Sequence, residues 1–134
     1  GNLSEKALSA WCAWFIALCD DQVTFMTRLL DLDGMKARLR ALIAFRAAHD
    51  KRIRIEAVVP LHHLFLAGPT PRGEFCRMTG LGERTARALL SRLLETDLVT
   101  SAGHTAPVRF AFPLDALKFL LPELYPEAAR PEEN

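Results

Sequence analysis

The sequence has few of the features that mark secreted, membrane or zinc-binding proteins. It contains three cysteines and no Cys-x-x-Cys pair, and no basic segment precedes an apolar signal. The longest apolar run, Ala10 to Cys19, is much shorter than the roughly 20 residues that a membrane-spanning helix needs. An odd number of cysteines within apolar helical patterns favours free thiols in a reducing compartment. We therefore expect a cytoplasmic protein without a membrane span or signal peptide.

A strong overall charge is also lacking. The formal net charge is +1, and 25% of the residues are charged, as in an ordinary packed globule. The charges are nevertheless unevenly placed, because residues 36–55 carry seven basic side chains and one acidic side chain, whereas acidic side chains predominate after residue 111. This asymmetry indicates a surface for a polyanion, although a solvated charged face is the commoner explanation.

No constellation of residues points to catalysis or metal binding. His62 and His63 lie in an apolar helical pattern without a second set of ligands. The acidic pairs Asp20-Asp21 and Asp31-x-Asp33 do not have the spacing of a calcium loop, and no glycine-rich phosphate loop follows a strand. Cys76 has no evident base beside it to make it a nucleophile. We expect that this chain is not itself an enzyme and that it binds no metal and no cofactor.

Two helices are predicted in the first 50 residues. Ser4 suits an N-cap, and apolar side chains then recur at helical spacing, which predicts a helix over residues 4–32. Asp33 and Gly34 interrupt that pattern, and a second amphipathic helix is expected to end near His49. Together they predict a helical hairpin.

The first helix is apolar on all sides between Ala10 and Cys19, so it must be covered on more than one side. A missing domain or a partner subunit fits this requirement, and so does covering by the second helix and the C-terminal segment. The excess apolar surface predicts a homodimer in which the first helix takes part. The residues expected at this interface are Trp11, Trp14, Phe15 and Leu18.

Residues 55–125 have the pattern of a winged helix-turn-helix. A helix is expected over about residues 56–67, where Pro60 is tolerable only near the first turn. Thr70-Pro71 has the cap residue and first-turn residue of a short helix that reaches about Thr79. Gly80-Leu81-Gly82 predicts a tight turn, and a recognition helix is expected from Glu83 to Thr96.

A β-hairpin, the wing, is expected to follow, with strands at about residues 98–100 and 108–112 and a short helix over 114–121. The predicted fold class is therefore mainly α. An N-terminal helical hairpin (residues 1–50) precedes a winged helix-turn-helix with a small β-hairpin wing (55–125), and a disordered tail (126–134) ends the chain.

The candidate DNA-binding residues lie on the recognition helix, on the helix before it and at the tip of the wing. A guanidinium group matches the acceptor pair of guanine, so Arg84 and Arg87 are expected to reach base edges in a major groove. Phosphate, base or minor-groove contacts are expected from Arg72, Thr85, Ser91, His104 and Thr105. Double-stranded DNA is the predicted partner, bound weakly by one copy and more tightly by a dimer on two half-sites.

Several stretches resemble the C-terminal region of bacterial Fic proteins (filamentation induced by cAMP). The most specific are Pro71-Arg72-Gly73-Glu74, Thr79-Gly80-Leu81 and Glu83-Arg84-Thr85-Ala86-Arg87. Further similar stretches are Leu3-Ser4-Glu5, Asp21-Gln22-Val23-Thr24-Phe25-Met26 and Pro107-Val108-Arg109-Phe110-Ala111-Phe112-Pro113-Leu114. The sequence departs from the family pattern at Gly82, where a serine would be a better N-cap.

The resemblance implies that the first helix is the trailing edge of a Fic catalytic domain, or a lever attached to one, and that this domain precedes the chain. Fic domains typically transfer AMP from ATP to a hydroxyl side chain of a protein target through an HPFxxGNGRxxR motif. That motif is absent here, so the resemblance implies no catalytic residue in this chain. Two functions follow as hypotheses: a DNA-binding module for transcriptional regulation or autoregulation, and an interaction or dimerisation module that orients the Fic domain or its target.

Overall fold

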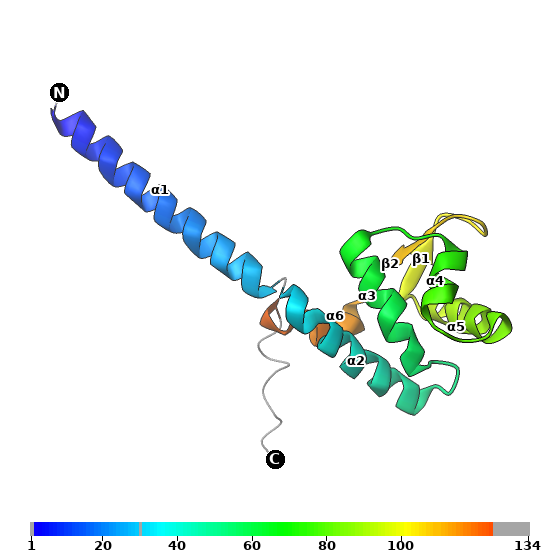
Figure 1. The fold of residues 1–134 in the computed structure, drawn as a ribbon. Helices are drawn as coiled ribbons and strands as arrows, with labels where there is room; N and C mark the ends of the chain where they lie inside the picture. The colour runs from blue at the N-terminus through cyan, green and yellow to red at the C-terminus, as the bar shows by residue number, and fades with distance from the viewer. Residues whose placement is uncertain (1, 30, 125–134) are drawn as a thin grey trace, which may run out of the picture. The chain divides into compact units, whose positions relative to one another are not determined.

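The computed structural model describes residues 2–29 and 31–124 and divides the chain into two units, Gly1–Asp31 and Leu32–Asn134 (Figure 1). The described part is mainly helical, with one small antiparallel sheet, which confirms the predicted fold class. The first unit holds α1 (Asn2–Leu29). The second holds α2 (Leu32–His49), the 3₁₀ turn η1 (Ile55–Ala57), α3 (Val58–Ala67), α4 (Arg72–Met78), α5 (Glu83–Glu95), β1 (Val99–Ser101), β2 (Val108–Phe110), α6 (Leu114–Leu120) and the 3₁₀ turn η2 (Pro122–Leu124). The predicted tail, residues 126–134, lies outside the described residues.

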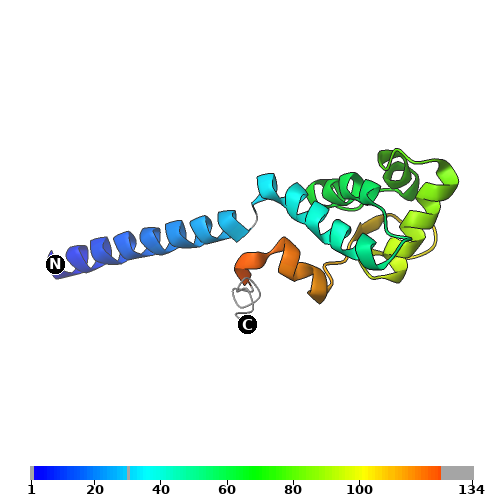
Figure 2. The same cartoon turned by 90° about the horizontal axis from the view of Figure 1, so that it is seen from below.

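The helix α1 is continuous over 28 residues and ends at Leu29 rather than at residue 32 as the sequence predicts (Figure 2). Every side chain from Ser4 to Arg28 is exposed. Glu5 in the first turn and Arg28 in the last turn complement the helix dipole. Despite its length and apolar residues, α1 does not meet the requirements of a membrane span, and neither does any other described helix.

The second helix packs into the core of the second unit. Its side chains Met35, Leu39, Leu42 and Ile43 are almost completely buried, and α2 packs against α3 and α6. The sequence assigns residues 32–50 to the N-terminal extension, whereas the structure makes them part of the winged-helix unit. The reason is that α3 and α6 cover the apolar stripe of α2.

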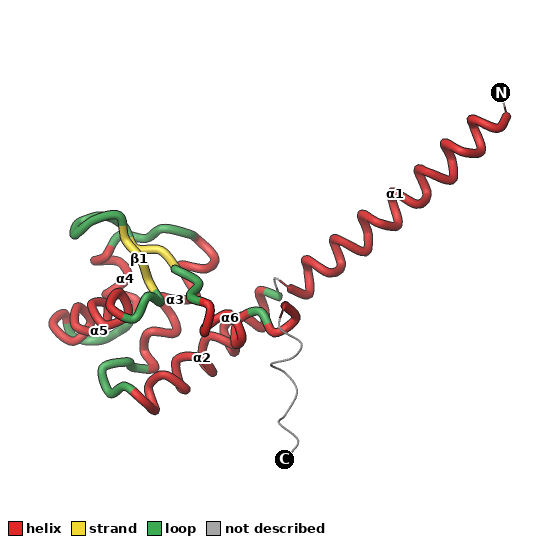
Figure 3. The backbone as a smooth tube through the Cα atoms, turned by 180° about the vertical axis from the view of Figure 1, so that it is seen from behind, coloured by secondary structure: helices red, strands yellow, loops and turns green. Residues whose placement is uncertain are grey.

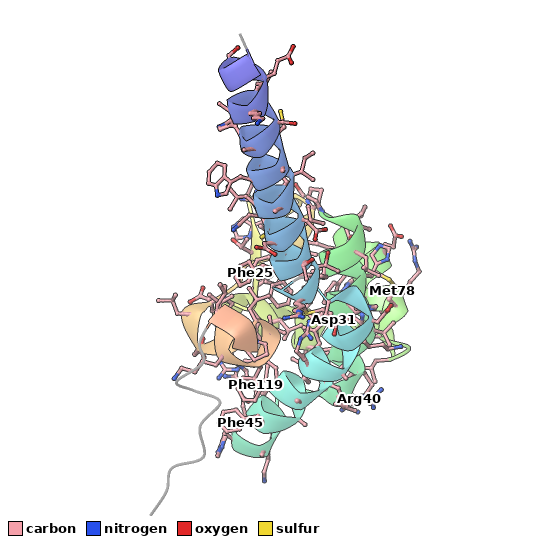
Figure 4. The ribbon with its side chains drawn as sticks, turned by 90° about the vertical axis from the view of Figure 1, so that its left-hand side faces the viewer. Phe25, Asp31, Arg40, Phe45, Met78 and Phe119 are labelled. Carbon is pink, nitrogen blue, oxygen red and sulfur yellow. The ribbon has the colours of Figure 1, made fainter. Side chains whose placement is uncertain are left out.

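Two side-chain contacts near the end of α2 also join this helix to α6. The rings of Phe45 and Phe119 lie side by side, with centroids 5.4 Å apart (Figure 4). Arg46 donates to the carboxylate of Asp115 over 2.7 Å, and the Arg46 side chain is only 15% exposed. The C-terminal helix is therefore an integral part of this unit.

The turn between α4 and α5 follows the glycine pattern of the sequence. Gly80 has φ +71°, a left-handed conformation that ends α4 and that a side chain would strain. The hydroxyl of Thr79 donates to Cys76 O and accepts from the backbone N–H of Leu81 (3.2 Å), which fixes the corner. Gly82 is the N-cap of α5 and offers no side-chain cap, as its glycine identity requires.

The wing is a short antiparallel hairpin in which Val99 faces Phe110 and Ser101 faces Val108 (Figure 3). The backbone of Val108 also exchanges two 2.9 Å hydrogen bonds with Thr70, which lies two residues before the start of α4. The second strand ends at Phe110 rather than at residue 112, because Phe112 adopts a left-handed φ of 51° that stops regular pairing. The base of the wing is thus attached to the helix-turn-helix.

His62 on α3 leads to a stability prediction. Its Nε2 atom is buried and has no hydrogen-bond partner among the described residues. An unmade hydrogen bond is costly in a protein interior, so His62→Leu should raise the free energy of unfolding by about 1 kcal/mol. Urea denaturation followed by circular dichroism measures this change. His63→Leu is the matched control, and a loss of stability specific to His62→Leu would contradict the prediction.

Candidate nucleic-acid interface

The outer face of α5 lies opposite its buried stripe. The buried side consists of Ala86, Leu89, Leu90 and Leu93. One hundred degrees of rotation per residue then places four exposed side chains near the centre of the opposite side. These are Arg84, Ala88, Ser91 and, in the last turn, Glu95. Because positions 88 and 91 carry small side chains, a bulky partner is able to approach the helix closely.

The two arginines of this face differ in their surroundings. Arg87 is paired with Glu83 one turn earlier, over 2.5 Å, and both side chains are more than 70% exposed. Arg84 is exposed and has no ion-pair partner within the described part of the chain. An exposed ion pair such as that of Arg87 and Glu83 contributes little to stability, so Arg87 can readily leave Glu83 for another anionic partner. Arg84 is therefore free to bind a partner directly, whereas Arg87 would first have to break its ion pair with Glu83.

Thr85 is exposed as predicted but lies on the other flank of α5 from Arg87. Ser91 shares a side with Arg87 and Arg84. The structure therefore brings Arg84, Arg87 and Ser91 together on one surface and sets Thr85 apart from them.

Arg72, another DNA-binding candidate of the sequence, is bonded to the wing. Its Nη2 donates to Gly103 O over 2.8 Å and its Nε donates to Ala106 O over 3.2 Å. The Ser101 hydroxyl lies within hydrogen-bonding distance of the same two carbonyl oxygens. The guanidinium of Arg72 thus holds the loop of the wing against the start of α4, and this contact takes up donors that the sequence assigned to DNA.

This contact leads to a prediction about the mobility of the wing. Arg72→Ala removes two donors, so the amides of residues 102–106 should exchange with solvent faster, by about tenfold, which corresponds to about 1.4 kcal/mol. Hydrogen–deuterium exchange with peptide resolution measures this change. Arg77→Ala on the same helix is the control, and equal exchange in the two variants would show that Arg72 does not fix the loop.

The wing presents one cation that sequence reasoning missed. His104 and Thr105 are exposed in its loop, as expected of the tip. Arg109 is exposed on β2 between the buried Val108 and Phe110. The alternation of apolar and polar residues in this strand is the signal that predicts such an outward side chain.

A groove of about 640 Å³ runs between α4 and α5. Its lining includes apolar side chains from both helices and the corner between them, and it also includes three arginines, one glutamate and a serine. Among the lining residues are Arg72, Cys76, Arg77, Leu81, Glu83, Arg87, Leu90 and Ser91. Arg77, exposed on α4, is a second cation that the sequence reasoning missed.

The thiol of Cys76 lies in this groove in a mixed environment. Burial raises the pKa of the Cys76 thiol, and the positive charges of Arg87 and Arg72 partly oppose that rise. The net result is a thiol that stays protonated at neutral pH. This agrees with a structural role for Cys76 rather than a nucleophilic one.

Ion pairs hold the other end of α5. Arg92 is bonded to Asp50 at the end of α2 (2.5 Å) and to Glu95 (2.9 Å). The backbone N–H of Arg52 and the side chain of Arg92 lower the pKa of the Asp50 carboxyl. Glu95, an acid that would repel DNA, forms ion pairs with Arg92 and Arg52, which partly neutralise its charge.

The residues predicted for a protein interface all lie on α1. Trp11, Trp14, Phe15 and Leu18 are 55%, 61%, 46% and 40% exposed, respectively. The rings of Trp11 and Phe15 stack with centroids 5.3 Å apart. Within the described residues, no group of three His, Cys, Asp or Glu side chains is arranged to hold a metal ion.

Comparison with known proteins does not indicate a function, so the function has to be inferred from the side chains described above. No protein-family model matches the chain, and no curated protein and no solved structure does so either.

Proposed function

We propose that residues 32–124 form a DNA-binding module that inserts α5 into a major groove. The observation that carries this proposal is the outer face of α5. Arg84 and Arg87 stand there beside small side chains, on the second helix of a helix-turn-helix. Guanidinium groups on such a helix are suited to the O6 and N7 acceptors of guanine.

The wing supports the same proposal, because His104, Thr105 and Arg109 add polar and basic groups on the hairpin. Such groups commonly bind the sugar-phosphate backbone or the minor groove next to the recognition helix. Arg72 and the bridge between Thr70 and Val108 keep the hairpin in place, so helix and wing form one preassembled surface.

The sequence stretches that resemble Fic proteins suggest the setting of this module. In our proposal it is the C-terminal regulatory part of a cytoplasmic Fic-family protein, and it controls transcription, including that of its own gene. The adenylyl transfer would belong to a domain outside this chain.

Titration of labelled duplex DNA tests the proposal. A pool of random 30-base-pair duplexes, followed by fluorescence anisotropy, should show binding that weakens steeply as salt rises, because bound counterions are released. Repeated selection from the pool should then enrich one sequence motif. Absence of binding at low salt, or absence of any enriched motif, would remove sequence-specific DNA recognition as the function.

A second candidate function, protein association through α1, is favoured by one observation. The exposed apolar side chains Leu8, Trp11, Phe15, Leu18 and Phe25 recur in steps of three and four, with Gln22 as the one polar member of the series. This is the spacing of a helix that packs along a second helix, and one polar residue in such a seam commonly fixes register. The occupant that we propose is a second copy of the chain, so that two modules bind two half-sites.

Sedimentation equilibrium measures this association. The chain should sediment as a dimer at about 100 µM, which requires a dissociation constant in the micromolar range, or about −8 kcal/mol. Trp11→Glu with Phe15→Glu should give a monomer, and Lys6→Glu is the control outside the seam. A wild-type monomer at this concentration would contradict self-association and leave the apolar face to a different protein.

A further inference from the structure

The groove between α4 and α5 combines an apolar floor with a cationic rim. The apolar part of its lining, here called the floor, includes Cys76, Leu81 and Leu90. The charged part, here called the rim, consists of three arginines, Arg72, Arg77 and Arg87, and one acid, Glu83, so the rim has a net positive charge. The volume, about 640 Å³, is within the usual range of small-molecule sites, about 300–1,000 Å³. An inorganic anion would leave the floor uncovered, and a neutral apolar ligand would make no use of the rim.

The geometry points to a small aromatic carboxylate as the ligand of this groove. Its ring would cover Leu81 and Leu90, and its carboxylate would accept hydrogen bonds from a guanidinium. Guanidinium groups also stack on aromatic rings, which favours an aromatic acid over an aliphatic one.

Arg77 is the arginine best placed to receive the carboxylate. Arg72 is bonded to the wing and Arg87 to Glu83, whereas Arg77 is exposed and has no ion-pair partner among the residues that the structure describes. A carboxylate at Arg77 would therefore break no existing contact of the protein. It would gain a charge-assisted hydrogen bond, which is stronger than one between neutral groups.

Binding of the acid opposes binding of DNA, an inference that rests on the proposed function. Arg87 and Ser91 belong both to the groove and to the face of α5 that is proposed to meet DNA. A bound aromatic acid adds a negative charge to the groove that Arg87 and Ser91 line and fills space beside them. The acid and DNA therefore exclude one another, and the acid acts as an effector that releases the module from DNA.

The three cysteines supply an internal test of the site. Cys76 lines the groove, whereas Cys12 and Cys19 are exposed on α1 in the other unit. The full chain is alkylated with N-ethylmaleimide in the presence of 1-naphthoate, and the rate at each cysteine is measured by mass spectrometry of peptides. The neutral analogue 1-naphthalenemethanol reports binding that needs no charge.

With a Kd of about 0.2 mM, as expected for a ligand of this size, about 1 mM naphthoate should slow alkylation of Cys76 about sixfold. The rates at Cys12 and Cys19 should not change, and the neutral analogue should protect Cys76 much less. Arg77→Ala should abolish most of the protection, whereas Arg40→Ala, an exposed arginine of α2, should retain it. No protection, equal slowing at all three cysteines, or equal protection by the neutral analogue would each overturn the site.

A second measurement separates the ligand site from DNA binding. In wild-type protein bound to duplex DNA, 1 mM naphthoate should raise the apparent Kd for DNA by the same factor of about six. Protection of Cys76 without any effect on bound DNA overturns the competition but supports the site. If the chain binds no DNA, the proposed function and the competition fall together, and the alkylation rates still decide whether the groove binds the acid.

Discussion

Replacing Arg84 and Arg87 together by alanine is expected to weaken binding to a selected DNA duplex about a hundredfold. Both side chains are exposed on the outer face of α5. Each guanidinium that binds a guanine edge contributes about 1–3 kcal/mol, and a factor of one hundred corresponds to about 2.7 kcal/mol. Anisotropy titrations at one fixed salt concentration measure the loss.

The salt dependence shows what the two arginines bind. If they read bases, the double variant should lose preference for the selected sequence and keep most of its binding to unrelated duplexes. If they bind phosphates, the slope of log K against log salt should fall by about one per arginine, with equal losses on all sequences. Arg40→Ala on α2 is the control. An unchanged affinity in the double variant would show that α5 does not enter the groove.

Glu83→Gln provides a change of opposite sign at the same surface. The Glu83 carboxylate pairs with Arg87 and would also lie near the DNA phosphates. Its neutral isostere frees the arginine and removes a repulsive charge, so affinity for DNA should rise severalfold. A fall in affinity would indicate that the pair with Glu83 positions Arg87 for binding.

Truncation of Phe75 to alanine is expected to lower the free energy of unfolding by about 3–5 kcal/mol. Phe75 lies on α4 and is the largest of the fully buried side chains in the described part of the chain. Small domains have only about 5–15 kcal/mol of total stability, so this loss would remove a large fraction of the stability of the second unit. Urea denaturation followed by circular dichroism measures the change.

Phe45→Ala removes the same side chain from an exposed site and serves as the control. Phe45 is 54% exposed and contacts mainly Phe119 and His49. Its loss should cost about 1 kcal/mol or less, because little apolar area leaves the core. Similar losses in the two variants would contradict the packing of α4 through Phe75.

Local sequence signals predicted the helix-turn-helix to within one or two residues. Pro71 lies directly before α4, Gly80 has the left-handed backbone that the turn requires, and α5 begins at Glu83 as predicted. Each of these features depends on the backbone preferences of a few consecutive residues, so a short stretch of sequence is enough to predict it. The small differences occur at element ends, such as Phe112, whose positive φ no local pattern predicts.

Relations between distant segments were not predictable in the same way. An apolar stripe such as that of α2 shows that a helix is covered but does not show by which elements, and the covering by α3 and α6 appears only in the fold. Arg72 is a further example, because the carbonyl oxygens that it binds lie 31 and 34 residues later in the chain. From sequence alone, such an arginine is indistinguishable from one that faces a phosphate.

The attachment of the hairpin to α4 has a consequence for selectivity. Two backbone hydrogen bonds at Thr70 and the guanidinium of Arg72 fix the hairpin to the start of α4, the helix that precedes α5. If α5 enters a major groove as proposed, a hairpin held in this way adjusts little to a duplex of different width, and the energetic cost of adaptation falls on the nucleic acid. Stiff or intrinsically narrowed tracts of DNA would therefore be discriminated by their shape, at base pairs that no side chain touches.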